Sequence, residues 1–187
     1  MIGWVILGVV AVLVLAVIMW IVSVYNKLVV ARNKVKNSWS QIDVQLERRF
    51  ALIPNLVETV KGYTKHEKDI FDQFAKARNV YQQANGSVAT ASEANSMLTS
   101  ALSRLIAVSE AYPELKADAH FKEMMSELSE TEDKVAYTRQ FYNDVVMTYN
   151  NKREVFPGSI VASMFGFKEA ELFKAGEESR ANIKVQF

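Results

Sequence analysis

An uninterrupted apolar run opens the chain and constrains its fold more than any other feature. It extends from Ile2 to Val24, is rich in Leu, Val and Ile, and has Ser23 as its one polar side chain. Roughly 23 residues that rise about 1.5 Å each suffice to cross a hydrocarbon core of about 30 Å. The sequence therefore predicts a transmembrane helix over Ile2–Val24, so that function is exerted from a membrane surface.

A cleaved signal peptide is the main alternative for this run, and it fits less well. Signal peptides begin with basic residues, contain a shorter apolar stretch and end in a small-residue cleavage site. No Lys or Arg precedes Ile2, and the run ends Val22-Ser23-Val24-Tyr25. The chain has no Cys for a lipoprotein anchor, a disulfide or a thiolate metal site. We therefore expect an uncleaved anchor.

Basic residues follow the run and predict its orientation. No acidic residue appears before Asp43, and basic residues close to a span are normally retained in the cytoplasm. We expect a single-pass protein of the cell (inner) membrane, with its N-terminus outside and its helical domain in the cytoplasm. The basic residues are Lys27, Arg32, Lys34 and Lys36.

Helical periodicity continues directly after the span. Apolar residues recur at steps of three and four, as on a helix face that packs against partner helices. Pro54 interrupts this pattern without flanking turn residues, so we expect a kink there rather than a chain reversal. Gly62 and the sequence Thr64-x-x-Glu67 predict a helix end followed by a capping box. The stripe comprises Leu28, Ala31, Val35, Trp39, Ile42, Leu46, Phe50, Ile53, Val57, Val60, Ile70, Phe74, Ala77, Tyr81 and Ala84.

Turn residues divide the rest of the chain into further helices. Asn85-Gly86-Ser87 predicts a turn, after which Thr90-x-x-Glu93 would cap a helix that Pro113 ends. A longer helix is expected from Glu114 to about Asn151.

Long amphipathic helices joined by short turns indicate an all-α fold. We expect the transmembrane helix to continue into an elongated antiparallel bundle of four-helix type, with coiled-coil-like packing and a short C-terminal tail. Phe156-Pro157-Gly158 precedes a short apolar helix at Ile160–Phe165. The expected domains are an anchor (1–25), a helical bundle (26–155) and a C-terminal helix with an aromatic tail (156–187).

Motifs that would carry chemistry are absent. Neither His66 nor His120 is preceded by Glu three residues earlier, as a di-iron bundle requires, and Ile70 replaces the second His of H-E-x-x-H. No nucleophile elbow, Walker loop or dinucleotide fingerprint occurs. Lys and Arg number 22 against 21 Asp and Glu, which argues against nucleic-acid binding. We therefore predict no catalytic residue, cofactor or metal, and interpret acidic residues around Glu132 as a solvated helix face.

The helix that follows the span has an unusual second face. Opposite the core stripe, uncharged residues occupy positions where a solvated face would carry Lys and Glu. This composition favours packing, either within the bundle or against another subunit. The candidate interface, called the Asn face below, comprises Asn26, Val30, Asn33, Asn37, Ser40 and Val44.

The tail is rich in Phe. Two interpretations remain open: a strap that covers an open side of the bundle, or a contact with a partner or the membrane interface. The residues concerned are Phe156, Phe165, Phe167, Phe173 and Phe187.

Several separated blocks between Tyr25 and Phe187 resemble the LemA family. The resemblance implies one membrane span and a cytoplasmic domain of four-helix type; it supplies no catalytic residues, since the biochemical function of the family is not established. Magnetosome-building relatives imply a role in membrane shaping. Lipoprotein relatives need a Cys that this chain lacks, so their topology does not transfer. The blocks are YNKLVVARNKVKNSWSQID, RRFALIPNLVETVKGYTKHE, LSRLIAVSEAYPELKA, ELSETEDKVAYTRQFYNDVV and FPGSIVASMFGF.

We therefore hypothesise a membrane-anchored, non-enzymatic helical scaffold of the LemA type that contacts the lipid bilayer and self-associates as a homo-oligomer. No Gly or Pro lies between Val24 and Leu46, so the span and the first helix after it are rigidly linked. The alternative is a regulatory adaptor that docks a membrane protein partner, either a protease or a signalling protein. Size in mild detergent separates the two, because a scaffold forms a large homogeneous assembly and an adaptor is monomeric.

The topology can be tested with one cysteine, because the wild type has none. Gly86→Cys should resist an impermeant thiol reagent in intact cells and react after lysis, since the positive-inside rule places position 86 in the cytoplasm. Labelling of intact cells would contradict the expected orientation.

Overall fold

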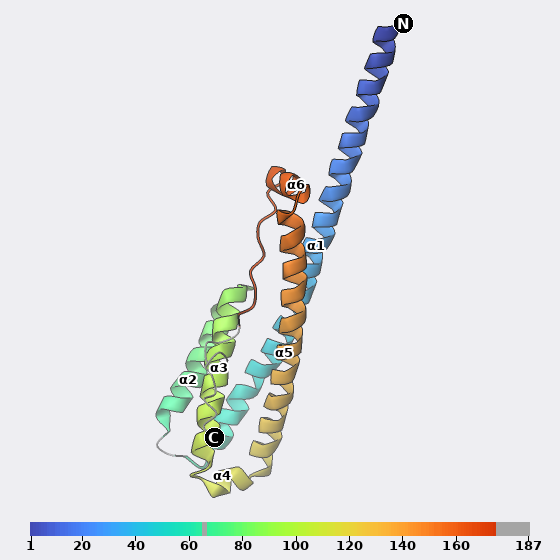
Figure 1. Ribbon diagram of the computed structural model, residues 1–187. Coiled ribbons are helices and arrows are strands. Elements are labelled where there is room, and N and C mark those ends of the chain that lie inside the picture. Colours follow the sequence, from blue (N-terminus) through green and yellow to red (C-terminus); the bar gives the residue numbers. More distant parts are fainter. Residues whose placement is uncertain (65–66, 175–187) are drawn as a thin grey trace, which may run out of the picture. The chain divides into compact units, whose positions relative to one another are not determined.

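The computed structural model describes residues 1–64 and 67–174, and within these ranges the chain forms six helices and no strand (Figure 1). An all-α fold that opens with a long apolar helix is thereby confirmed. His66 and Phe187, which the sequence singled out, lie outside the described residues. The helices are α1 (Ile2–Lys61), α2 (Lys68–Gln83), α3 (Val88–Ser109), α4 (Pro113–Ala117), α5 (Ala119–Glu154) and α6 (Gly158–Met164).

Helix α1 is continuous over 60 residues and includes Pro54. The chain therefore does not reverse at this proline, although Pro54 has no N–H to donate to the Phe50 carbonyl. Ile53 and Leu56 on either side are buried. Packing of the apolar stripe thus compensates for the missing backbone hydrogen bond, and the helix ends only at Lys61 before Gly62.

The chain divides into two compact units. Unit 1 combines Met1–Ser38 with Asn143–Ala170, and unit 2 combines Trp39–Tyr142 with the chain from Glu171 onward. The sequence predicts a division into an anchor, a bundle and a tail at residues 25 and 155. That division is not based on compactness, so the two units do not test it and it stays a prediction. The core of unit 1 includes Leu28, Ala31, Val146, Tyr149, Val161 and Phe167, and that of unit 2 includes Ile42, Leu46, Phe74, Leu98, Leu105, Leu128 and Tyr142.

Helices α2 and α3 form a hairpin across the predicted turn. Asn85 and Gly86 have φ angles of 45° and 82°, in the left-handed region that Asn and Gly tolerate. The prediction that Thr90 caps α3 is wrong by three residues, because the Ser87 hydroxyl accepts the Thr90 N–H at 3.3 Å. A cysteine at position 86 would be strained, so exposed Gln83 is the better position for the topology reporter.

Two further helix boundaries differ from the sequence predictions. Thr64 does not cap α2, since its hydroxyl donates to the Val60 carbonyl at 3.1 Å and α2 begins only at Lys68. Pro113 starts α4 instead of ending α3, as suits a residue without a backbone N–H to lose. Both differences arise because a local pattern indicates which residue types occur at helix ends, whereas tertiary packing decides at which residue each helix begins or ends.

Asp118 divides the helix that was expected to run from Glu114 to Asn151. Its carboxylate accepts the Phe121 N–H at 2.8 Å, which caps the first turn of α5, and the Tyr63 hydroxyl at 2.9 Å. These bonds, that of Phe121 first, lower the pKa of Asp118 below its ordinary value. The new helix start is therefore marked by a capping carboxylate.

A buried arginine connects three helices within unit 2. The Arg49 side chain on α1 is 2% exposed, donates to the Asn95 and Thr99 side chains on α3, and forms an ion pair with Glu132 on α5. Burial lowers the pKa of Arg49, and the Glu132 carboxylate opposes that shift. Glu132, which the sequence placed on a solvated face, is 38% exposed, but its carboxylate also forms this ion pair, which the sequence did not predict.

Removing the acidic partner should be costly. Glu132→Ala leaves the buried guanidinium without its counter-charge, and we expect a loss of about 2–3 kcal/mol in the free energy of unfolding, below the roughly 3–5 kcal/mol of a fully buried pair because solvent reaches Glu132. The double variant Arg49→Met with Glu132→Ala should recover most of that loss. Urea denaturation measures both variants, and an equal cost of Glu132→Ala with and without Arg49 would show that the two are not coupled.

Candidate functional site

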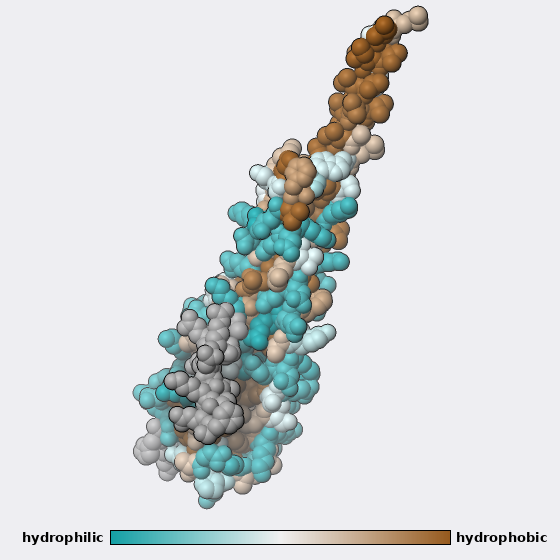
Figure 2. All heavy atoms as spheres, viewed as in Figure 1, coloured by the Kyte–Doolittle hydropathy of each residue, from teal (hydrophilic) through white to brown (hydrophobic). Residues whose placement is uncertain are grey.

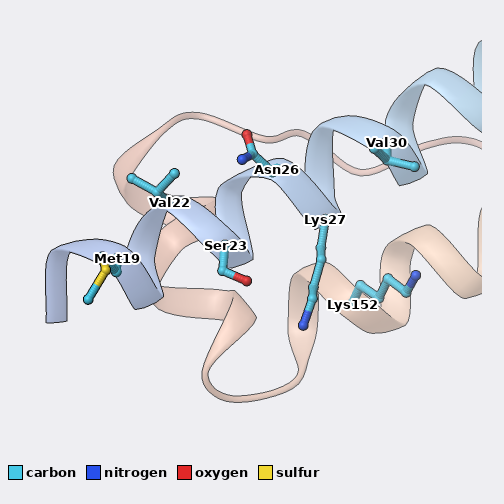
Figure 3. Close-up of a pocket in the computed structure, with 7 residues that line it drawn as sticks. All are labelled: Met19, Val22, Ser23, Asn26, Lys27, Val30 and Lys152. Carbon is cyan, nitrogen blue, oxygen red and sulfur yellow. The ribbon is translucent and has the colours of Figure 1, made fainter. Parts of the chain in front are cut away.

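A shallow groove in unit 1 is the strongest candidate site. It has a volume of about 530 Å³ and lies where the predicted span gives way to the following helix (Figure 3). Helix α1 contributes most of its lining, and α5 contributes one lysine. The lining residues are Met19, Val22, Ser23, Asn26, Lys27, Val30 and Lys152.

The groove combines an apolar end with a cationic end. Met19 and Val22 belong to the predicted span, whereas Lys27 and Lys152 lie outside it. In Figure 3 the Lys27 side chain extends from α1 toward the segment that carries Lys152. Ammonium groups bind phosphate oxygens as point charges, and the groove contains no nucleophile beyond the Ser23 hydroxyl. Its chemistry suits binding of an anionic group beside an apolar chain.

Contacts of the residues just before Lys152 hold the tail against α5. The Tyr149 hydroxyl donates to the Lys168 carbonyl at 2.7 Å, and the Asn150 side chain pairs with the Ala170 backbone through bonds of 2.9 and 3.0 Å. Burial raises the pKa of Tyr149, so its phenol stays protonated and keeps donating. These bonds hold the last turn of α5 against the tail within unit 1.

The Asn face is exposed along its whole length. Each of the six candidate residues is exposed, and Val30 and Val44 retain 56% and 60% of their accessible surface. The described residues thus leave the side chains of this face largely open to solvent. Asn26 and Val30 also line the groove, so the structure brings the predicted interface and Lys152 together. Lys152 could not be predicted as a lining residue from the sequence, because only the fold brings it beside α1.

The predicted span has the surface that a bilayer would cover. Among the described residues, α1 is the one helix long and apolar enough to cross a membrane, and none of its apolar window is buried (Figure 2). Ile2 is exposed and Val24 half-buried at the two ends of the predicted span. This helix fits a membrane anchor.

The aromatic tail divides into two parts. Phe167 is buried in unit 1, and Phe173 is buried in unit 2 with its ring centroid 6.2 Å from that of Trp39, as the strap interpretation expects. Phe156 and Phe165 are exposed. In unit 2 the strap is also fixed by the Tyr142 hydroxyl, which donates to the Glu171 carbonyl at 2.8 Å; burial raises the pKa of Tyr142 to about 12.

Conventional reactive centres offer little by comparison. His120 is exposed, and the described residues contain no group of three or more His, Asp or Glu side chains that could hold a metal ion. The perturbed carboxylates Asp118 and Glu130 owe their lowered pKa values to structural partners, the Phe121 N–H first for Asp118 and the Lys134 ammonium first for Glu130.

Comparison with known proteins decides the family. The sequence model of the LemA family matches residues 38–187. The chain belongs to the LemA family. Residues 25–37, which also carry the resemblance, precede the matched region.

Relatives of this LemA family member include magnetosome proteins. Two MamQ proteins of Paramagnetospirillum magneticum are each 30% identical over 80% of this chain. The chain spans 64% of the length of these relatives. The protein LemA of Metamycoplasma hominis is 25% identical over 84% of this chain and 72% of its own length.

The strap contacts beside Lys152 can be tested at one side chain. Asn150→Ala removes both bonds to Ala170, so we expect faster hydrogen exchange of the Ala170 amide and a loss of about 1–2 kcal/mol in unfolding free energy. Asn150→Asp keeps an acceptor for that amide and should preserve more of its protection. Equal exchange in all three proteins would contradict the role assigned to Asn150.

Proposed function

We propose that this LemA family member is a membrane-anchored, non-enzymatic helical scaffold that self-associates through the Asn face of α1. The observation that carries the proposal is an exposed, uncharged stripe on the helix that forms the anchor. Its members recur at alternating steps of four and three, which is the spacing of a seam between two helices.

The composition of the stripe supports a lateral contact. Asn26, Asn33 and Asn37 belong to unit 1 and have short amide side chains that permit close helix approach and hydrogen bonding across a contact. Val30 contributes apolar surface between them. Membrane anchoring confines copies to one plane and one orientation, so a contact that is weak in solution becomes effective.

Two further parts of the proposal rest on the sequence. The non-enzymatic role follows from the lack of nucleophile, phosphate-binding and metal motifs, and the cytoplasmic orientation follows from the basic residues after the span. The names of the magnetosome relatives agree with a function tied to a membrane compartment. The proposal does not depend on any activity that those longer relatives have as whole proteins.

The alternative of a regulatory adaptor is favoured by one feature of unit 2. A groove of about 600 Å³ between the end of α3, α4 and the start of α5 exposes Ile106 beside Pro113 and Met125, with Lys116 and Lys122 at its edge. Such a surface suits an apolar segment of a membrane protein partner. A monomer in mild detergent that binds such a partner, and loses it with Ile106→Glu, would favour this function.

The scaffold is tested by introducing charge into the seam. Asn33→Lys with Asn37→Lys places like charges across a symmetric contact, so we expect loss of oligomers with unchanged helicity and little change in melting temperature. Light scattering in mild detergent and cross-linking in membranes measure the assembly.

A matched control adds the same charge elsewhere in unit 1. Met147→Lys with Asn151→Lys changes two exposed positions of α5 and should leave the oligomers intact. Mixing the lysine variant with Asn33→Glu and Asn37→Glu chains should restore assembly. Full assembly of the lysine variant alone would show that the contact lies outside the Asn face.

A further inference from the structure

Helix α6 exposes an apolar side that the scaffold does not use. Gly158, Val161 and Ala162 are buried on its inner side, whereas the outward side and the adjoining residues are large and apolar. A short surface helix normally presents polar residues outward. Figure 2 shows hydrophobic atoms gathered at the place of α6. The exposed residues are Val155 (64%), Phe156 (74%), Ile160 (48%), Met164 (64%) and Phe165 (52%).

Ring contacts place this side at the level where α1 leaves the apolar run. Tyr25 directly follows Val24, and its ring centroid is 4.9 Å from that of Phe165 and 5.6 Å from that of Phe167. The interfacial layer on each side of a bilayer is about 5–7 Å thick, as the difference between total and hydrocarbon thickness gives. A tyrosine at the end of a span is expected in that layer, and Phe165 is in ring contact with it.

The groove independently places the end of α5 at the same height along α1 as the end of the predicted span. Lys152, two residues before the last residue of α5, lines it together with Met19 and Val22 of the predicted span (Figure 3). The end of α5 that leads into α6 therefore lies beside the last turns of the span, within unit 1.

Close packing fixes α6 in this position. A Cβ at Gly158 would collide with the Lys152 carbonyl, so α6 folds back tightly on the end of α5. The Arg32 guanidinium lies 5.1 Å from the centroid of the Phe167 ring, and buried Phe167 continues the chain after α6. The apolar side is thus held outward by the structure.

We propose that the outward side of α6 is a second bilayer contact, which inserts into the boundary between headgroups and acyl chains of the leaflet where α1 emerges. Apolar residues with flanking cations are the composition of interfacial segments. Exposed Lys27 and Lys152, which line the groove at the end of the predicted span, are cations that can contact lipid phosphates. The proposal rests on the membrane anchor of the proposed function. Attachment at two points fixes the rotation of unit 1 about the span, and this sets the direction in which Asn33 and Asn37 face neighbouring copies.

The test measures depth with single cysteines in the full chain, which has no native Cys. Met164→Cys, Met147→Cys and Val12→Cys each carry an environment-sensitive fluorophore in vesicles of phosphatidylcholine and phosphatidylglycerol with brominated acyl chains. Met147 is the matched control, since it is 55% exposed on α5 of the same unit. We expect bromine quenching in the order 12, then 164, with position 147 unquenched.

A substitution pair separates insertion from nonspecific effects. Ile160→Asp should abolish quenching and the blue-shifted emission of the probe at position 164. Ile106→Asp changes an isoleucine of similar exposure, 49%, in unit 2 and should leave the probe unchanged.

Each remaining outcome overturns the assignment. Quenching at 12 but not at 164 keeps the anchor and removes the second contact, whereas absence of quenching at 12 refutes the anchor itself. Quenching at 147 equal to that at 164 shows that the bilayer contact is not specific to α6. A blue shift at 164 that vanishes on dilution with lipid, without bromine quenching, assigns the surface to a second copy of the chain.

Discussion

One helix supplies the apolar stripe on which both units are built. Along α1 the steps of three and four place Leu28 and Ala31 in the core of unit 1, and Ile42 and Leu46 in the core of unit 2. Burying such side chains stabilises each unit by roughly 1.5–3 kcal/mol per large residue, so several of them together exceed the cost of about 3 kcal/mol for a proline within the same helix. Because α1 carries the predicted span and both stripes without a break, the candidate anchor and the core of both units belong to one element.

Polar contacts give this apolar framework its register. In unit 2 the Arg49 guanidinium satisfies groups on α3 and α5 at once, and an arginine in this position penalises any arrangement that leaves it without Glu132. In unit 1 the Asn150 amide pairs with the Ala170 backbone and fixes an irregular segment that has no helix bonds of its own. Apolar area favours packing in general, whereas these directional bonds select one alignment.

Three exposed features of unit 1 lie on elements near the end of the predicted span. They are the part of the Asn face up to Asn37, the groove at Lys27 and the apolar side of α6. None of them has the arrangement of a reaction centre, and each suits contact with lipid or another helix. A membrane scaffold requires surfaces of this kind, since its work consists of holding orientation and spacing.

The sequence alone predicted the all-α fold, the apolar span and a large part of the core. Periodicity over long segments is a strong signal, so the buried positions Leu46, Phe50, Ile70 and Phe74 follow from spacing. Helix ends were less accessible: Ser87 and Asp118 took the capping roles because packing chose the turn at which each helix starts. Capping residues recur every few positions along such a chain, and local chemistry cannot rank them.

The partners of residues far apart in the chain were decided only by the tertiary structure. The sequence placed Glu132 on a solvated face, and only the fold pairs its carboxylate with Arg49. Lys152 likewise lines the same groove as Lys27 only because the fold brings the end of α5 beside α1. The Phe residues of the tail show the same limit. Their hydrophobicity predicts that they tend to be buried, but it does not predict that Phe167 lies in the core while Phe165 remains exposed beside Tyr25. A helical pattern states which side of an element is buried, because that side repeats along the chain. It cannot state which other element that side packs against, because contacts between distant segments depend on how all the elements pack at once.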